Sequence, residues 1–350
     1  MTRIFYLASD LSSNAGAKLL SFLSPALPSD RFVVATTNLR VSAKNHVRGY
    51  WTLKKAIEDF RPDVLHAIGP VAALWTSLLL APRIGLRRRP KLVVSQNDQP
   101  AFGVLGWLNR RANHSADAIV SQTETQANRY LNQGISPDRI HTILPAVAPL
   151  DGLPDGDAFR QSLGIPQSAP LVMAVGRFDT IADLKTAVWA FDVVKHVVPE
   201  LHLVLIGDGP ERERLKRLGR AIGFDDYRVR FAGFRSDVAG LLNLAEVVWI
   251  THQHGGINVA LEAMAAGKPI VALQTPELAE IIEDTVTGQF VAPGNKVRLA
   301  AVTNELLANP ELAKQMGEVG RKRAATHFAL APLVARFSVI YDKLMTDGPR

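Results

Sequence analysis

The chain has 350 residues, of which 47% are hydrophobic and 21% are charged. This length suffices for two domains with separate cores, and the composition is typical of a soluble globular protein. Cysteine is absent, which excludes disulfides and thiolate metal sites. The opening residues, MTRIFYLASD, lack the apolar segment and cleavage site of a signal peptide and predict a first strand instead.

Positive charge is concentrated in the first part of the chain, although the formal total is only +7. Residues 1–150 contain 18 Lys and Arg against 9 Asp and Glu, whereas residues 151–350 contain 22 against 24. The asymmetry favours an acidic partner for the first half, such as an anionic membrane surface or a phosphorylated acceptor, although solubility explains it equally well. No nucleic-acid-binding module accompanies the charge, so we expect no nucleic acid partner.

The first half alternates short apolar strands with helices. Strands are predicted at residues 3–8, 32–36, 64–67, 92–95 and 118–121, and helices at 17–27, 52–60, 71–80 and 106–113. This alternation favours a parallel, doubly wound sheet. Gly16 ends a polar loop after the first strand, where helix amides could contact a ligand, but a simple turn that begins a helix explains a single glycine better.

A basic surface is predicted from two runs, at Arg83, Arg87, Arg88, Arg89, Lys91, Arg110 and Arg111. With Trp107 as an aromatic anchor, such a surface suits lipid headgroups, and the competing interpretation is a solvated loop. We therefore expect a cytoplasmic protein that can lie peripherally on the inner face of the membrane.

A composition rich in Pro, Gly and Asp marks residues 151–168 as a linker with one short helix. Its triplet Asp155-Gly156-Asp157 superficially resembles a metal-binding DxD motif. Because the triplet lies in a turn-rich stretch and not after a buried strand, a turn is the better interpretation, and we expect no metal site. The predicted domains are residues 1–150 and 169–328, followed by a C-terminal helix over residues 329–350.

The second domain begins with the apolar strand APLVMAVGRFD, which ends at Gly176-Arg177. An arginine at the carboxyl end of a parallel strand points to where such sheets bind ligands, and its planar guanidinium fits phosphate oxygens. Two further segments, LHLVLIGDGPER and VRFAGFRSD, repeat the pattern of strand and glycine turn.

The stretch VVWITHQHGGINVALEAMAAGKPIVAL, residues 247–273, predicts a strand, a glycine turn, a helix and a second strand. Gly255 and Gly256 allow a ligand to approach the backbone closely. The helix that begins at Ile257 and Asn258 presents free N–H groups suited to a phosphate. Glu262 lies further along this helix and could accept hydrogen bonds from sugar hydroxyls.

Within that stretch, HGGINVALEAMAAGKPIVA resembles the donor-site motif of glycosyltransferase family 4, whose members are retaining enzymes with the GT-B fold. The resemblance implies two Rossmann-like domains that face each other across a cleft, with a C-terminal helix that crosses back to the first domain. It also implies transfer of a sugar from a nucleoside diphosphate sugar to a lipid, glycan or small molecule, without a metal or another cofactor. The catalytic residues implied are Arg177, His254 and Glu262.

The same resemblance assigns substrate contacts to Gly16, Asn97, Gly176, Lys185, Gly207, Phe234, Arg235, Gly255, Gly256, Ile257 and Asn258. The chain departs from the family pattern at three positions. His254 stands where the first of two glutamates is expected, Asn97 where a histidine is frequent, and Ala182 where a lysine accompanies the arginine. Lys185 follows Ala182 by almost one helical turn and is a candidate substitute. His66 matches a position common in the family, although a histidine at a strand end is more often structural.

These departures leave two functional classes open. One is an active transferase, which we favour because Arg177, the glycine turn and Glu262 occur together. The other is an inactive relative that binds a nucleotide, a lipid or a protein. A phosphorylase of similar fold is a remote third, since no lysine suited to an aldimine cofactor is evident. His254 could supply a positive charge or a hydrogen bond to the sugar, or His252 and His254 are merely exposed loop residues.

Overall fold

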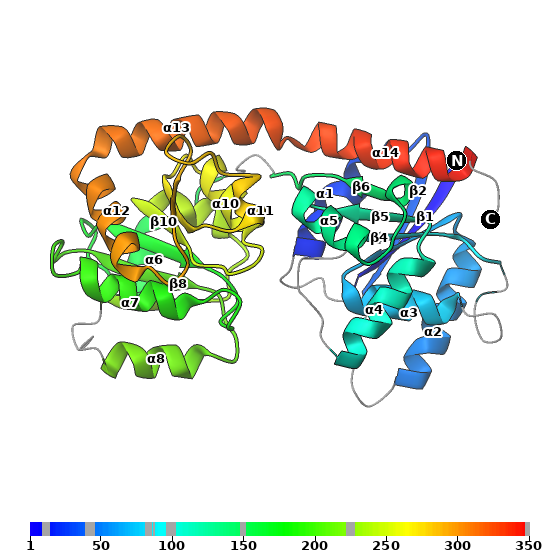
Figure 1. Ribbon diagram of the computed structural model, residues 1–350, viewed down its shortest axis with the longest axis horizontal. Helices are drawn as coiled ribbons and strands as arrows, with labels where there is room; N and C mark the ends of the chain where they lie inside the picture. Colours follow the sequence, from blue (N-terminus) through cyan, green and yellow to red (C-terminus); the bar gives the residue numbers. More distant parts are fainter. Residues whose placement is uncertain are drawn as a thin grey trace. The chain divides into compact units, whose positions relative to one another are not determined.

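The computed structural model describes residues 1–8, 15–38, 46–80, 86, 88–95, 103–147, 152–221 and 228–346. Three residues named above, Arg83, Arg87 and Asn97, lie outside these ranges. Contacts between Cα atoms divide the chain into two units, one formed by residues 1–146 and 330–350 and the other by residues 147–329 (Figure 1). Each unit contains one six-stranded sheet, and helices flank it.

The first unit has a parallel sheet with strand order β2-β1-β3-β4-β5-β6. Its strands are β1 (Thr2–Ala8), β2 (Phe32–Asn38), β3 (Val64–Ile68), β4 (Lys91–Ser95), β5 (Ala118–Ser121) and β6 (Ile140–Thr142). Its helices are α1 (Ala15–Ala26), α2 (His46–Phe60), α3 (Pro70–Leu79), α4 (Gly103–Ser115), α5 (Glu124–Asn132) and α14 (Leu330–Thr346), with a short 3-10 turn at Pro137–Arg139. The doubly wound parallel sheet predicted for this half is therefore confirmed.

Apolar side chains fill both faces of this sheet. Along β3, Leu65 and Ala67 pack in one core, whereas Val64 and Ile68 pack in the core on the other face. Strands of this kind need helices on both sides, because a parallel sheet with an apolar exposed face would be unstable in water. The alternation of strand and helix along the sequence supplies those helices.

The C-terminal helix α14 belongs to the first unit and shares the core of α1 and β1, as the predicted return of the last helix to the first domain requires. Among the described residues, Pro310–Thr346 is the one helical stretch long and apolar enough to span a membrane. This is weak evidence for a span, because α14 buries Phe337 and Ile340 in the core and a core helix passes the same test.

A buried polar network connects α14 to the sheet. The hydroxyl groups of Tyr6 and Tyr341 lie 2.9 Å apart, and His66 Nδ1 lies 2.8 Å from the Tyr341 hydroxyl. His66 Nε2 lies 2.8 Å from Ser95 Oγ. Burial lowers the pKa of His66 to about 3 and raises that of Tyr6, so all members are neutral at pH 7. His66 therefore has a structural role in this network.

The second unit has a parallel sheet with strand order β12-β11-β10-β7-β8-β9. Its strands are β7 (Leu171–Val175), β8 (His202–Ile206), β9 (Val229–Gly233), β10 (Val247–Ile250), β11 (Ile270–Leu273) and β12 (Gln289–Val291). Its helices are α6 (Gly156–Ser162), α7 (Leu184–Val194), α8 (Arg212–Ala221), α9 (Val238–Leu241), α10 (Ile257–Ala265), α11 (Pro276–Ala279), α12 (Lys296–Ala308) and α13 (Pro310–His327), with a 3-10 turn at Leu242–Leu244.

The order of the strands in this sheet indicates where a ligand would bind. The chain runs outward from β7 in both directions of the sheet, to β8 and β9 on one side and to β10 and beyond on the other. Ligands of such sheets bind at this switch point, beyond the carboxyl ends of the strands.

The triplet Asp155-Gly156-Asp157 begins helix α6. Asp155 accepts hydrogen bonds from the Asp157 and Ala158 amides, both at 3.0 Å, and so caps α6. Within the described ranges, no group of three or more His, Asp or Glu side chains could hold a metal ion.

Candidate functional site

Glycines join the carboxyl ends of neighbouring strands in the second unit. The Gly207 amide after β8 donates to the Gly233 carbonyl at 2.8 Å, and the Gly176 amide after β7 donates to the Ile206 carbonyl at 3.0 Å. A Cβ atom on Gly207 would lie 2.0 Å from the Gly176 carbonyl oxygen, and the φ of Gly207 is 134°. Only glycine fits there, so the predicted residues Gly176 and Gly207 form one compact edge.

The loops after β7 and β10 are bound to each other. Thr251 Oγ1 donates to the Ala182 carbonyl at 2.7 Å, and the Gln253 amide donates to the Ile181 carbonyl at 2.9 Å. Asp179 Oδ1 accepts from the amides of Ile181 and Ala182, each at 3.0 Å. The switch point of the sheet is therefore a fixed structure, in which a ligand would meet both loops at once.

Arg177 projects from this edge and is available to a ligand. Its side chain is 70% exposed, and its Nε lies 3.4 Å from Asp179 Oδ2. A solvated ion pair of this length contributes little to stability. An incoming phosphate can therefore bind the guanidinium without breaking a strong contact.

The N-terminus of α10 is also open. Gly255 and Gly256 have φ values of 73° and 79°, which L-residues with side chains rarely adopt. The helix begins at Ile257, and its N-cap residue, Gly256, offers no side chain to cap it. The Ile257 side chain is buried, so its backbone N–H and that of Asn258 are what this turn offers a ligand. Glu262 lies on the same helix and is 7% exposed.

Among the residues that depart from the family pattern or could compensate for a departure, one is buried and two are exposed. Ala182 is 1% exposed, and a Cβ atom on Gly176 would lie 2.8 Å from its Cβ. The expected lysine position is thus at the edge of the site, but here it is small and apolar. Lys185 lies exposed in the first turn of α7, and His254 lies exposed in the loop after β10.

Three other predicted contacts have different settings. Phe234 is 55% exposed beyond β9. The Arg235 guanidinium pairs with Asp237 through Nε–Oδ1 at 2.8 Å and Nη2–Oδ2 at 2.6 Å, which raises the arginine pKa and lowers that of the carboxyl. A ligand would compete with Asp237 for this side chain. Gly16 lies inside α1 in the first unit, because the helix begins one residue earlier, at Ala15.

The sequence analysis assigned no site role to some residues that shape this edge. His252 is packed between the loops after β7 and β10, which contradicts its interpretation as merely exposed. Asp179 holds the turn before α7, and Asp183 within that turn has a φ of 44°, a strained value for a residue other than glycine. The available signal was position, since each of these polar residues follows a buried strand by a few residues.

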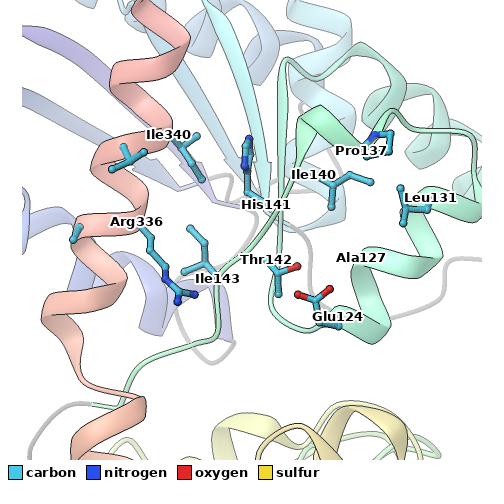
Figure 2. A pocket seen from close by; sticks show the side chains of 12 residues that line it. Glu124, Ala127, Leu131, Pro137, Ile140, His141, Thr142, Ile143, Arg336 and Ile340 are labelled. Carbon is cyan, nitrogen blue, oxygen red and sulfur yellow. The ribbon is translucent and has the colours of Figure 1, made fainter.

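The first unit has a separate groove between α5, β6 and α14, of about 670 Å³ (Figure 2). Its walls are mainly apolar, with Leu131 and Ile140 on one side and Ile340 on the other. Glu124 and Arg336 are its charged residues. None of the site residues predicted from the sequence lines this groove, so it is distinct from the edge of the second sheet.

Comparison with known proteins agrees with this geometry. The sequence model of the family described as "Glycosyl transferases group 1" matches residues 155–323, and that of "Glycosyl transferase 4-like domain" matches residues 20–146. The chain therefore belongs to the group 1 or family 4 glycosyltransferases, and this is the family whose donor-site motif the sequence resembles. Its fold is GT-B: Anabaena HepE in complex with UDP-glucose superposes with a TM-score of 0.82 at 18% identity, covering 98% of this chain and 100% of HepE.

Two curated relatives are more similar to the chain in sequence than HepE, but they match a smaller share of it. N-acetyl-alpha-D-glucosaminyl L-malate synthase of Bacillus anthracis is 27% identical over 55% of this chain and 50% of its own length. Alpha-D-kanosaminyltransferase of Streptomyces kanamyceticus is 26% identical over 68% of this chain and 63% of its own length. The chain thus spans between half and two thirds of these two relatives.

Proposed function

We propose that this chain is a retaining glycosyltransferase that moves a hexosyl group from a nucleoside diphosphate sugar to an acceptor, without a metal ion or another cofactor. The observation that carries the proposal is the placement of Arg177 and the open amides of α10 after adjacent strands at the switch point. Further support comes from HepE, a fold neighbour whose structures contain UDP and UDP-glucose.

The proposed chemistry follows from charge. The bond from sugar C1 to the diphosphate oxygen breaks while the acceptor oxygen bonds to C1 on the same face, and the acceptor proton passes to the leaving phosphate. Negative charge grows on the diphosphate, so a fixed cation and preorganised amides lower the barrier. Arg177 and the amides of Ile257 and Asn258 serve this role. Glu262 accepts hydrogen bonds from the ribose, and His254 faces the transferred sugar.

Calorimetry with UDP, GDP and ADP tests the proposal. We expect one of them to bind with a dissociation constant that rises in the variant Arg177→Ala, and the matching nucleotide sugar to be hydrolysed slowly. Binding without any turnover would instead identify an inactive relative that retains the nucleotide site. If none of the three nucleotides binds, the proposed function is wrong. The anomeric configuration of a product, measured by NMR, tests retention.

We also propose that the acceptor is anionic or membrane-associated, which places the protein at the inner face of the cytoplasmic membrane. Support comes from Trp107, 54% exposed on α4, and from the exposed Arg110 and Arg111 on the same helix. In a sedimentation assay at low salt, the protein should pellet with vesicles of phosphatidylglycerol and should stay in the supernatant with vesicles of phosphatidylcholine. Trp107→Ala combined with Arg110→Glu should abolish retention, and equal sedimentation with both lipids would contradict the proposal.

A further inference from the structure

The imidazole of His252 bridges the two loops of the site. A Cβ atom on Gly176 would lie 3.0 Å from His252 Cε1 and 3.1 Å from Nε2. A Cβ atom on Gly256 would lie 3.1 Å from His252 Cγ and 3.2 Å from its Cβ. One edge of the ring thus touches the residue before Arg177, and the opposite edge touches the glycine before the α10 amides. A side chain at either glycine would therefore crowd this ring.

The two ring nitrogens have different surroundings. Nδ1 is buried and has no hydrogen-bond partner among the described residues. Nε2 is not one of the buried atoms that lack a partner, and the side chain as a whole is partly exposed. Nε2 is therefore the nitrogen that a ligand at this edge can reach.

This asymmetry decides where the proton resides. A proton on Nδ1 would be a buried donor without an acceptor, which is among the least tolerated arrangements in proteins. A proton on Nε2 can bond water or a ligand. Burial lowers the pKa of His252 to about 4, and the nearby Asp179 carboxylate, which also pairs with Arg177, only partly opposes this. The ring is consequently a neutral donor through Nε2 over the usual pH range.

We infer that His252 donates a hydrogen bond from Nε2 to the diphosphate of the donor and compensates for the lysine that is absent at Ala182. The inference rests on the proposed function. Its geometric basis is the position of the ring between the Arg177 loop and the α10 turn, against the same point of Gly176 that Ala182 contacts. Because the donor is neutral, its contribution to binding should be the same at pH 6 and pH 8, unlike that of a histidine with an ordinary pKa.

Three substitutions at one position test the role. His252→Gln retains an N–H group near the place of Nε2, His252→Asn places its amide near Nδ1 instead, and His252→Ala removes both. With UDP as the probe in calorimetry, we expect His252→Ala and His252→Asn to raise the dissociation constant about 10-fold or more, and His252→Gln to raise it less than about 3-fold. If the wild type binds UDP and His252→Ala binds it equally well, the inference is wrong. Failure of the wild type to bind any nucleotide would instead reject the proposed function.

Nuclear magnetic resonance of the wild-type protein with 15N-labelled histidine keeps the inference testable if a variant does not fold. We expect His252 to show the tautomer protonated at Nε2 at both pH 6 and pH 8, and its Nε2 resonance to shift when UDP is added. A merely structural histidine would show no shift on addition of UDP. An Nδ1-protonated ring, or an unchanged Nε2 resonance in the nucleotide complex, would overturn the inference.

Discussion

His66 in the first unit and His252 in the second are histidines in different surroundings. His66 lies within β3 and His252 just beyond β10, and burial lowers the pKa of both. Both ring nitrogens of His66 have protein partners, whereas the buried Nδ1 of His252 has none among the described residues. A satisfied buried group stabilises the fold, and an unsatisfied group is stabilised by a ligand. On the proposed function, the buried histidine of the first sheet serves cohesion, and the histidine beside the second sheet serves binding.

The largest effect that would sharpen this contrast is expected from Arg177→Ala. Loss of one preorganised cation should lower kcat by about 100- to 1,000-fold, roughly 3–4 kcal/mol, and should affect the dissociation constant for UDP less. The thermal midpoint should not change, because the side chain is exposed. Initial rates and calorimetry measure this, with Arg214→Ala on α8 as a surface control. A larger loss of affinity than of turnover would contradict the role in the transition state.

Glu262→Ala should act on binding. If the carboxylate accepts hydrogen bonds from the ribose as proposed, its removal should weaken nucleotide binding by about 1.5–3 kcal/mol, roughly 10- to 150-fold. Because Glu262 is buried, Glu262→Gln serves as a matched variant that keeps the shape of the side chain. Calorimetry with UDP and with uracil alone distinguishes loss at the ribose from loss at the base. An unchanged dissociation constant would refute the ribose assignment.

Tyr341→Phe should have the opposite profile. The variant removes a hydroxyl that contacts both Tyr6 and His66, and should lower the free energy of unfolding by about 1–3 kcal/mol. Nucleotide binding by the second unit should not change. Urea unfolding and calorimetry on the same sample measure the two properties. Phe337→Leu, in the same core without a hydrogen bond, controls for simple packing.

The smallest expected effect near neutral pH is a pH dependence of stability, which grows as the pH falls. The pKa of His66 is about 3 in the folded protein and 6.5 in its ordinary range, so the unfolded chain binds more protons as the pH falls. The stability contributed by neutral His66 is present above pH 6.5 and is lost as the pH falls toward 3, with a slope that approaches about 1.4 kcal/mol per pH unit. In His66→Gln this part of the slope should disappear. If the free energy of unfolding has the same slope between pH 6 and pH 4 in the wild type and in His66→Gln, His66 is not the origin of this pH dependence.

The sequence predicted the periodic parts of the fold and the glycine turns of the site. Strands such as β7 and β10 are continuous apolar runs, and Gly176 and Gly207 directly follow runs of this kind, so local patterns suffice to find them. Contacts across the sheet were beyond local reasoning. The bond from Thr251 to Ala182 joins residues far apart in the chain, and the burial of the His252 ring depends on both loops at once.

Side-chain competition was the second obstacle. Arg235 lies at a position where the family motif predicts a substrate contact. However, its Nε and Nη2 donate hydrogen bonds to the carboxylate of Asp237, two residues later. The roles of His254, Lys185 and Asn97 stay predictions. The sequence locates them near strand ends, but it does not determine which atoms a bound sugar would reach.

The position of Tyr341 in the chain bears on how the first unit can fold during synthesis. The first unit is discontinuous, since its sheet is made before the second unit and α14, which completes its core, is made after it. The second unit is continuous and can fold while the ribosome is still translating. Until residue 341 leaves the ribosome, Tyr6 and His66 lack the partner that buries them in the folded protein. We therefore expect nascent chains halted before α14 to depend on chaperones more than the released protein does.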